Sequence, residues 1–217
     1  MHERISRMTE QRITEDAEPT PLTAAQLIEM ENDCEMTPVT GTQLLQLVMD
    51  RLADIQHELH HGAFSNIKLL RRAESEDYFQ VWLGGELNLR SHGRFQVVRE
   101  PQVADKKKPD ILVTSSDPGG KQVAIEMKLV DKSWTVSKLE EGLSRQLVGQ
   151  YLRHESCCHG IYILVRQRKM CWKTDGIEMT FEMLLERLAG QAAQLTQRMS
   201  IGGEVVVLQP FNAEARR

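Results

Sequence analysis

The sequence predicts an α/β fold in which helices flank a central sheet of parallel and antiparallel strands. Two observations carry this prediction. Apolar residues recur every three or four positions in the segments that we expect to be helices, which are 42–62, 75–90, 137–154 and 180–199. Short apolar or alternating segments bounded by turn residues predict strands at 94–100, 110–115, 122–129, 160–166 and 204–209.

The first two predicted helices each present one apolar face. Thr42 is expected to cap the first helix and Gly62 to end it. The apolar stripe of this helix consists of Leu44, Leu45, Val48, Leu52, Ile55 and Leu59. The second helix carries Phe79, Leu83 and Leu87 on its inner face. A helix with one such face packs against a sheet or another helix.

The hydrophobic period changes from helical to extended after residues 92–93. The turn residues 117–120, Asp-Pro-Gly-Gly, join the second and third strands, so these strands are expected to form an antiparallel hairpin. A helix, a strand and a further helix follow, and Gly202-Gly203 lead into the last strand. From residue 75 onward the predicted order is therefore αβββαβ, followed by one more helix and strand.

The chain has 217 residues, of which 41% are hydrophobic and 27% charged, as in a globular protein that buries a core. No apolar run approaches the roughly 18 residues that cross a membrane. The polar N-terminus is unlike a signal peptide, so we expect a cytoplasmic protein. Residues 1–41 are predicted to be a flexible acidic leader or linker with a short helix at about 23–35, and residues 42–217 to form the main domain.

The net charge limits how the protein could bind nucleic acid, and the cysteine spacing indicates whether disulfides are expected. The net charge of −4 excludes a protein whose whole surface binds nucleic acid, so any contact with DNA must come from local basic patches, an oligomer or a partner. Four cysteines without regular spacing are expected to be free thiols rather than a disulfide framework.

Three charged residues are predicted to converge on the central hairpin. Asp110 opens the second strand, while Glu126 and Lys128 lie two residues apart on the third and so point to one face. Phosphodiester hydrolysis uses this combination: carboxylates hold Mg²⁺, and lysine orients or deprotonates water or stabilises transition-state charge. The backbone carbonyl of Met127 is a further candidate ligand. An amphipathic surface hairpin would alternate in the same way, with both charges solvated.

The segments KKKPDILV and VAIEMKLVD resemble the PD-(D/E)xK, or restriction-endonuclease-like, nuclease superfamily, whose core has the order αβββαβ. The resemblance covers about residues 75–166, with looser support on either side. It implies that 42–217 is a nuclease-like domain with a restriction-endonuclease-like αβββαβ core and a mixed central sheet. It also implies that Asp110 and Glu126 bind Mg²⁺, with Mn²⁺ as a substitute, and that Lys128 is catalytic.

Two further positions follow from the resemblance. Many members add a glutamate from the first core helix; Glu76 and Glu86 are both candidates, and we favour Glu86 because it lies in the apolar stretch WLGGEL. RecB-type members place a glutamine and a tyrosine four residues apart on the helix after the hairpin. Here the tyrosine is displaced by one, and Gln146 is the preferred catalytic candidate, ahead of Gln150 and Tyr151.

Basic residues for phosphate contacts are local. Lys106, Lys107 and Lys108 precede Asp110, and Arg145 lies on the following helix near Lys138 and Arg153. A charge run of this kind is as often a solvated loop.

The function implied is a magnesium-dependent DNA endonuclease that uses direct attack by water. The chain is also similar to nuclease effector domains of large bacterial proteins, including defence proteins, so DNA and a homo-oligomer or larger assembly are the expected partners. The alternative is a catalytically silent nuclease-fold module for nucleic-acid binding or assembly. Such a module would be expected to lack one of the three charged residues.

Residues 57–61, His-Glu-Leu-His-His, match the HExxH pattern of zinc proteases. The helical period places His57 and His61 opposite the apolar stripe, toward solvent, and no third ligand follows. We therefore expect no zinc site there.

Overall fold

The computed structural model describes residues 23–25, 36–63, 65–100, 108–131, 134–174 and 176–199, together with the backbone of 206–212. The chain divides into two compact units, Met1–Met36 and Thr37–Arg217. In the first unit, residues 24 and 25 are helical, and the rest of the helix expected at 23–35 lies outside the described residues. Lys106 and Lys107 lie outside them as well.

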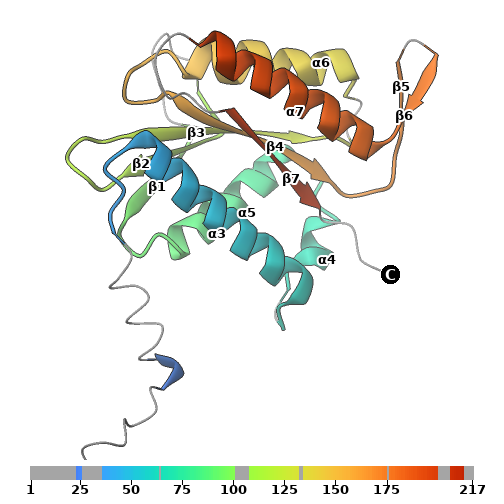
Figure 1. Ribbon diagram of the computed structural model, residues 1–217. Helices are drawn as coiled ribbons and strands as arrows, with labels where there is room; N and C mark the ends of the chain where they lie inside the picture. The colour runs from blue at the N-terminus through green and yellow to red at the C-terminus, as the bar shows by residue number, and fades with distance from the viewer. Residues whose placement is uncertain are drawn as a thin grey trace, which may run out of the picture. The chain divides into compact units, whose positions relative to one another are not determined.

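A mixed sheet forms the centre of the second unit, with the strand order β1-β2-β3-β4-β7 (Figure 1). Its strands are β1 (Phe95–Arg99), β2 (Ile111–Ser115), β3 (Gln122–Leu129), β4 (His159–Arg166) and β7 (Val206–Asn212). The first three pair antiparallel, whereas β4 runs parallel to both β3 and β7. The prediction of an α/β protein with a mixed sheet flanked by helices is confirmed.

Helices cover both faces of this sheet (Figure 1). One face packs against α3 (Gly41–His61), α4 (Ile67–Leu70) and α5 (Glu76–Leu89). The other packs against α6 (Val136–Glu141), the π-helix η2 (Gly142–Tyr151) and α7 (Phe181–Arg198). Successive residues of β3 alternate between the faces: Ile125 and Met127 join the first core and Ala124 the second. Glu126 and Lys128 lie two and four residues after Ala124, so they lie on the same face of the strand and face α6 and η2.

The N-cap of helix α3 lies two residues before the predicted one. Thr40 is the N-cap, and its hydroxyl accepts a hydrogen bond from the Gln43 amide while the Gln43 side chain accepts from the Thr40 amide. This reciprocal pair satisfies two donors that a helix start otherwise leaves open. Thr42 lies inside the helix, where its hydroxyl is 3.4 Å from His159 Nε2. Gly62 ends the helix, as predicted.

The helix predicted at 137–154 is two helices of different type. Helix α6 is α-helical and η2, which directly follows it, is a π-helix of 10 residues. In a π-helix each amide bonds five residues back, so the turns are wider than in an α-helix. Apolar periodicity does not announce this change, because the buried residues Leu139, Leu143 and Leu147 keep a spacing of four.

A short hairpin was not predicted. Strands β5 (Trp172–Thr174) and β6 (Ile177–Met179) pair antiparallel, and Gly176 between them adopts a φ of 78° that favours glycine. Each strand has three residues, too few to show an alternation. Over the described part of the chain, no helix has the length and apolar character to cross a membrane.

Candidate active site

The candidate site lies where β3 extends beyond its neighbour β2. Strand β2 pairs with the first four residues of β3, Gln122–Ile125. On the remaining half, which we call the β3 edge (residues 126–129), carboxylates take the place of a neighbouring strand. Asp110 Oδ2 accepts a hydrogen bond from the Met127 amide at 2.6 Å, and Glu76 Oε1 accepts one from the Leu129 amide at 2.9 Å. Two carboxylates from distant parts of the sequence thus converge on one strand.

Glu126 and Lys128 form a buried ion pair beside them. Lys128 Nζ lies 2.6 Å from Glu126 Oε1, and the two side chains are only 6% and 3% exposed. The amphipathic hairpin with solvated charges is therefore not what the structure has. Isolated charges at this depth would be strongly unfavourable, and each here is compensated by the other. The indole of Trp134 adds a cation–π contact, with Lys128 Nζ 5.3 Å from the ring centroid.

Burial and the neighbouring charges shift the pKa values of these groups. Burial, and then the negative charge of Glu126, raises the pKa of Asp110 to about 7. Burial likewise raises the pKa of Glu126, although the adjacent Lys128 opposes this. Burial alone would lower the pKa of Lys128, but Glu126, Glu76 and Asp110 together raise it. The site thus holds more negative charge than one lysine balances.

One oxygen of Glu126 lacks a partner. Its Oε2 is buried and has no hydrogen-bond partner among the residues that the structure describes. The Tyr151 hydroxyl is close enough to lower the pKa of Glu126, but it donates its proton to the Lys108 carbonyl at 2.8 Å. Buried polar atoms are rarely left unpaired, so an unpaired carboxylate oxygen beside Asp110 suits a bound cation.

The donors at the β3 edge fit a magnesium ion. A residue in a strand directs its amide and carbonyl toward the same neighbour, so the Met127 carbonyl shares the side of the amide that binds Asp110. Within the described ranges, no three His, Cys, Asp or Glu side chains form a cluster that could hold a metal. Mg²⁺ does not require one, because it is commonly held by one or two carboxylates, with water and substrate phosphate completing its shell.

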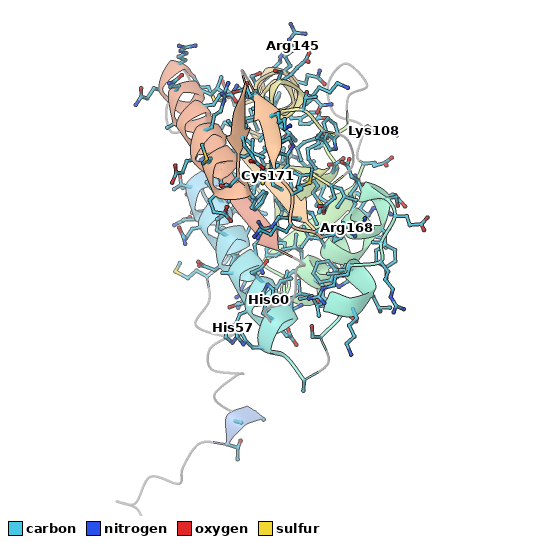
Figure 2. The ribbon with its side chains drawn as sticks, turned by 90° about the vertical axis from the view of Figure 1, so that its right-hand side faces the viewer. His57, His60, Lys108, Arg145, Arg168 and Cys171 are labelled. Atoms are coloured by element: carbon cyan, nitrogen blue, oxygen red, sulfur yellow. The ribbon has the colours of Figure 1, made fainter. Side chains whose placement is uncertain are left out.

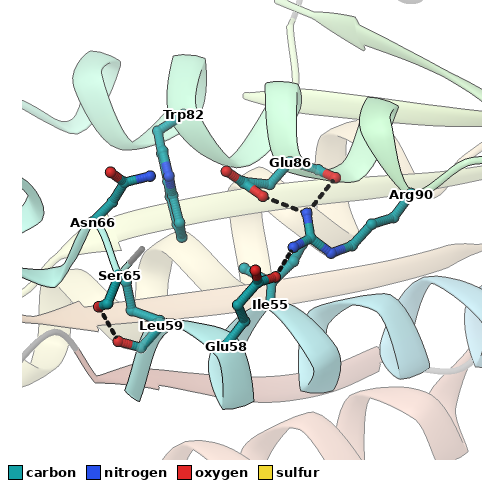
Figure 3. A pocket seen from close by; sticks show the side chains of 8 residues that line it. All are labelled: Ile55, Glu58, Leu59, Ser65, Asn66, Trp82, Glu86 and Arg90. Atoms are coloured by element: carbon teal, nitrogen blue, oxygen red, sulfur yellow. Dashed lines mark hydrogen bonds and ion pairs between the residues drawn. The ribbon is translucent and has the colours of Figure 1, made fainter. Parts of the chain in front are cut away.

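Glu76, rather than Glu86, is the helix carboxylate at this site. Glu86 instead forms ion pairs within a second cluster: Arg90 binds both Glu86 and Glu58 (Figure 3). These residues line a separate small pocket of about 70 Å³ between α3 and α5. The preference for Glu86 is therefore corrected. One signal in the sequence argues against Glu86: Arg90 lies four residues later and is placed to form an ion pair with it.

The π-helix places Tyr151 near the cluster. Tyr151 follows Gln146 by five residues, and in a π-helix residues five apart lie about one turn from each other. The hydroxyl of Tyr151 donates a hydrogen bond to the Lys108 carbonyl. Burial raises the pKa of Tyr151, and the hydroxyl lies close enough to Glu126 for that carboxylate to raise this pKa further. Gln146 and Gln150 line a pocket next to the cluster instead. The π-helical geometry, which the sequence does not reveal, thus places Gln146 and Tyr151 about one turn apart.

The described basic residues lie at the margin of the site. Lys108 and Arg145 are exposed, and both lie in the upper part of Figure 2, well away from His57 and His60. Arg145 pairs with Glu141 at 2.8 Å, and Lys108 lies 3.9 Å from Glu100. Neither cation belongs to the buried cluster, although Arg145 lines the pocket next to it.

The histidines of the HExxH pattern face solvent, as predicted. His57 and His61 are exposed on α3, with ring centroids 4.7 Å apart. Glu58, the residue between them that a zinc protease would use as a base, is engaged with Arg90.

Comparison with known proteins gives no relative. No family model matches the chain, and neither a curated protein nor a solved structure matches it.

Proposed function

We propose that the protein is a magnesium-dependent DNA nuclease of the restriction-endonuclease-like type. One observation carries the proposal: Asp110, Glu126, Lys128 and Glu76 converge at the β3 edge, and the buried Glu126 Oε2 lacks a partner among the described residues. The order of elements from α5 to β4, αβββαβ apart from the π-helical continuation of α6, is the order expected for that superfamily.

Asp110, Glu126 and the Met127 carbonyl would hold the cation. When bound, it would neutralise the scissile phosphate and lower the pKa of a bound water. Glu76 adds negative charge at the same edge and keeps β3 in place through the Leu129 amide.

Lys128 is best suited to stabilising charge. Its raised pKa keeps the ammonium protonated at neutral pH, so this side chain orients the phosphate and balances the charge that develops in the transition state. We do not assign it the role of a base, because a lysine base needs a lowered pKa.

A cutting assay on the purified full chain tests this function. Supercoiled plasmid is incubated with the protein and Mg²⁺ or Mn²⁺, and nicked and linear products are followed over time. We expect cutting that EDTA abolishes and that Asp110→Asn reduces by about a hundredfold or more, as expected when an essential electrostatic group is removed.

Glu86→Gln is the matched control, because it removes a helix carboxylate outside the cluster. It should cut at close to the wild-type rate, and circular dichroism should show that all variants are folded. Cutting by Asp110→Asn at the wild-type rate would refute the site. DNA binding without cutting by the wild type would favour the catalytically silent module instead.

A further inference from the structure

A pocket of about 510 Å³ opens beside the ion pair. It is lined by Trp134, Lys138, Glu141, Gly142, Arg145, Gln146 and Gln150. The volume lies within the roughly 300–1,000 Å³ range of pockets that enclose small ligands. Trp134 links it to the active site, since its ring lines this pocket and also contacts the Lys128 ammonium.

The lining combines three chemistries. Trp134 offers an aromatic surface, Gln146 and Gln150 offer amide donors and acceptors, and Lys138 and Arg145 supply two cations against the single carboxylate of Glu141. An apolar ligand would leave the amides and charges unsatisfied. A nucleotide matches all three, because it has a π face, a polar base edge and a phosphate.

Hydrogen bonds and close packing hold the backbone of the pocket in place. The Trp172 indole donates a hydrogen bond to the Trp134 carbonyl at 2.9 Å, and Tyr162 donates one to the Leu139 carbonyl at 3.1 Å, at the start of the helical wall. Gly142 lies against this hydroxyl so closely that a Cβ would come within 2.5 Å of it. These contacts hold the backbone on two sides of the pocket before a ligand binds, whereas the Lys138, Glu141 and Arg145 side chains are exposed.

We propose that this pocket binds one unpaired nucleotide next to the scissile phosphate, so that the preferred substrate is single-stranded DNA or a duplex with an unpaired end. The inference rests on the proposed function. A base within a duplex is stacked on both faces and paired along its edge, so it would have to leave the helix to enter. Unpaired bases avoid that energetic penalty.

Binding measured without cutting tests this inference. In the Asp110→Asn background, fluorescence anisotropy is recorded for a labelled oligothymidylate and for a blunt duplex of equal length, with Mg²⁺ present. Trp134→Leu should weaken oligothymidylate binding by about five- to a hundredfold, as expected for the loss of one stacking partner. Trp134→Phe should retain most of the affinity, and blunt-duplex binding should change less than about threefold in both variants.

Gln146→Leu provides a second variant if Trp134→Leu does not fold. It should weaken oligothymidylate binding selectively, because it removes an amide from the same pocket without touching Lys128. Equal effects on both DNAs, or no effect on either, would overturn the pocket assignment.

The outcomes for pocket and nuclease are separable. Wild-type protein that cuts plasmid, combined with Trp134-independent binding of single strands, would reject the pocket and leave the nuclease intact. Protein that cuts nothing but binds single strands through Trp134 would retain the nucleotide pocket and reject the nuclease.

Discussion

At the scale of single residues, the buried like charges of the site lower the stability of the folded protein. Asp110 and Glu126 are close enough to raise each other's energy, and one Lys128 ammonium compensates them only in part. Charges that oppose each other in the metal-free state are a common feature of functional sites. The metal-free protein should therefore be strained where the bound form is not.

Asp110→Asn should stabilise the metal-free protein although it abolishes cutting. The raised pKa means that the folded state disfavours the ionised carboxyl, so the stability that Asp110 contributes is present below about pH 4 and is lost as pH rises toward about 7. Asparagine retains an acceptor for the Met127 amide and removes the charge. We expect a gain of about 1–3 kcal/mol at pH 8 and a smaller one at pH 5, measured by urea unfolding with EDTA.

A purely structural Asp110 would give the opposite sign. Its replacement would then destabilise the protein at pH 8, and the difference between wild type and variant would not grow with pH.

Glu76→Gln should reduce cutting by about 10- to 100-fold, the usual effect of changing a group that supports a metal site. Glutamine still accepts a hydrogen bond from the Leu129 amide, so the fold should persist. Glu86→Gln, in the same helix, is the matched control and should leave cutting unchanged. Equal losses in the two variants, measured as plasmid cleavage rates, would contradict the distinction between the two glutamates.

At the scale of elements, strand parity makes much of the site predictable from the sequence. The period of two in β3 places Glu126 and Lys128 on one face, and the Asp-Pro-Gly-Gly turn brings Asp110 beside them. Glu76 is harder to identify from the sequence. Its contact with β3 exists because β2 pairs only with residues 122–125, so that the Leu129 amide has no partner on β2 and donates to Glu76 instead. The π-helix is not predictable from periodicity, since the buried residues Leu139, Leu143 and Leu147 keep the spacing of four that an α-helix would also show.

Gly142, the first residue of η2, is closely packed, and Gly142→Ala should destabilise the protein by about 1–3 kcal/mol, as overpacking does. Its Cβ would lie 2.5 Å from the Tyr162 hydroxyl, which is buried and bonded to Leu139. Gly190→Ala is the control, because that helical glycine of α7 has open space around it and should gain about 0.5–1 kcal/mol. Urea unfolding that moves both midpoints in the same direction would contradict the close packing of Gly142 against Tyr162.

At the scale of the whole molecule, charge limits how the protein holds its substrate. The net charge is −4, and two of the described cations near the site, Lys108 and Arg145, are each paired with a glutamate. Because binding to duplex DNA grows with the number of neutralised phosphates, the isolated chain should hold duplex weakly. An oligomer, or a partner protein that delivers DNA, would supply the additional binding affinity for duplex DNA.

Magnesium should stabilise the whole domain through the cluster. A ligand that binds only the folded state adds about 2.7 kcal/mol at a hundred times its dissociation constant. The melting temperature should therefore rise with added Mg²⁺ in the wild type and stay constant in an Asp110→Asn, Glu126→Gln double variant. A rise of equal size in both would place the metal elsewhere.

The most direct test of the active-site assignment is the cleavage rate of Lys128→Met, compared with Lys173→Met on the exposed face of β5. Methionine fills the space of the lysine stem and removes the ammonium beside Glu126. Lys128→Met leaves the buried Glu126 carboxylate without its partner and should lower stability, so cleavage is compared at a temperature where circular dichroism shows the variant folded; there the nuclease account predicts a loss of about a hundredfold or more in plasmid cleavage with Mg²⁺. Lys173→Met should cut like the wild type. Unchanged cleavage by folded Lys128→Met would contradict the account.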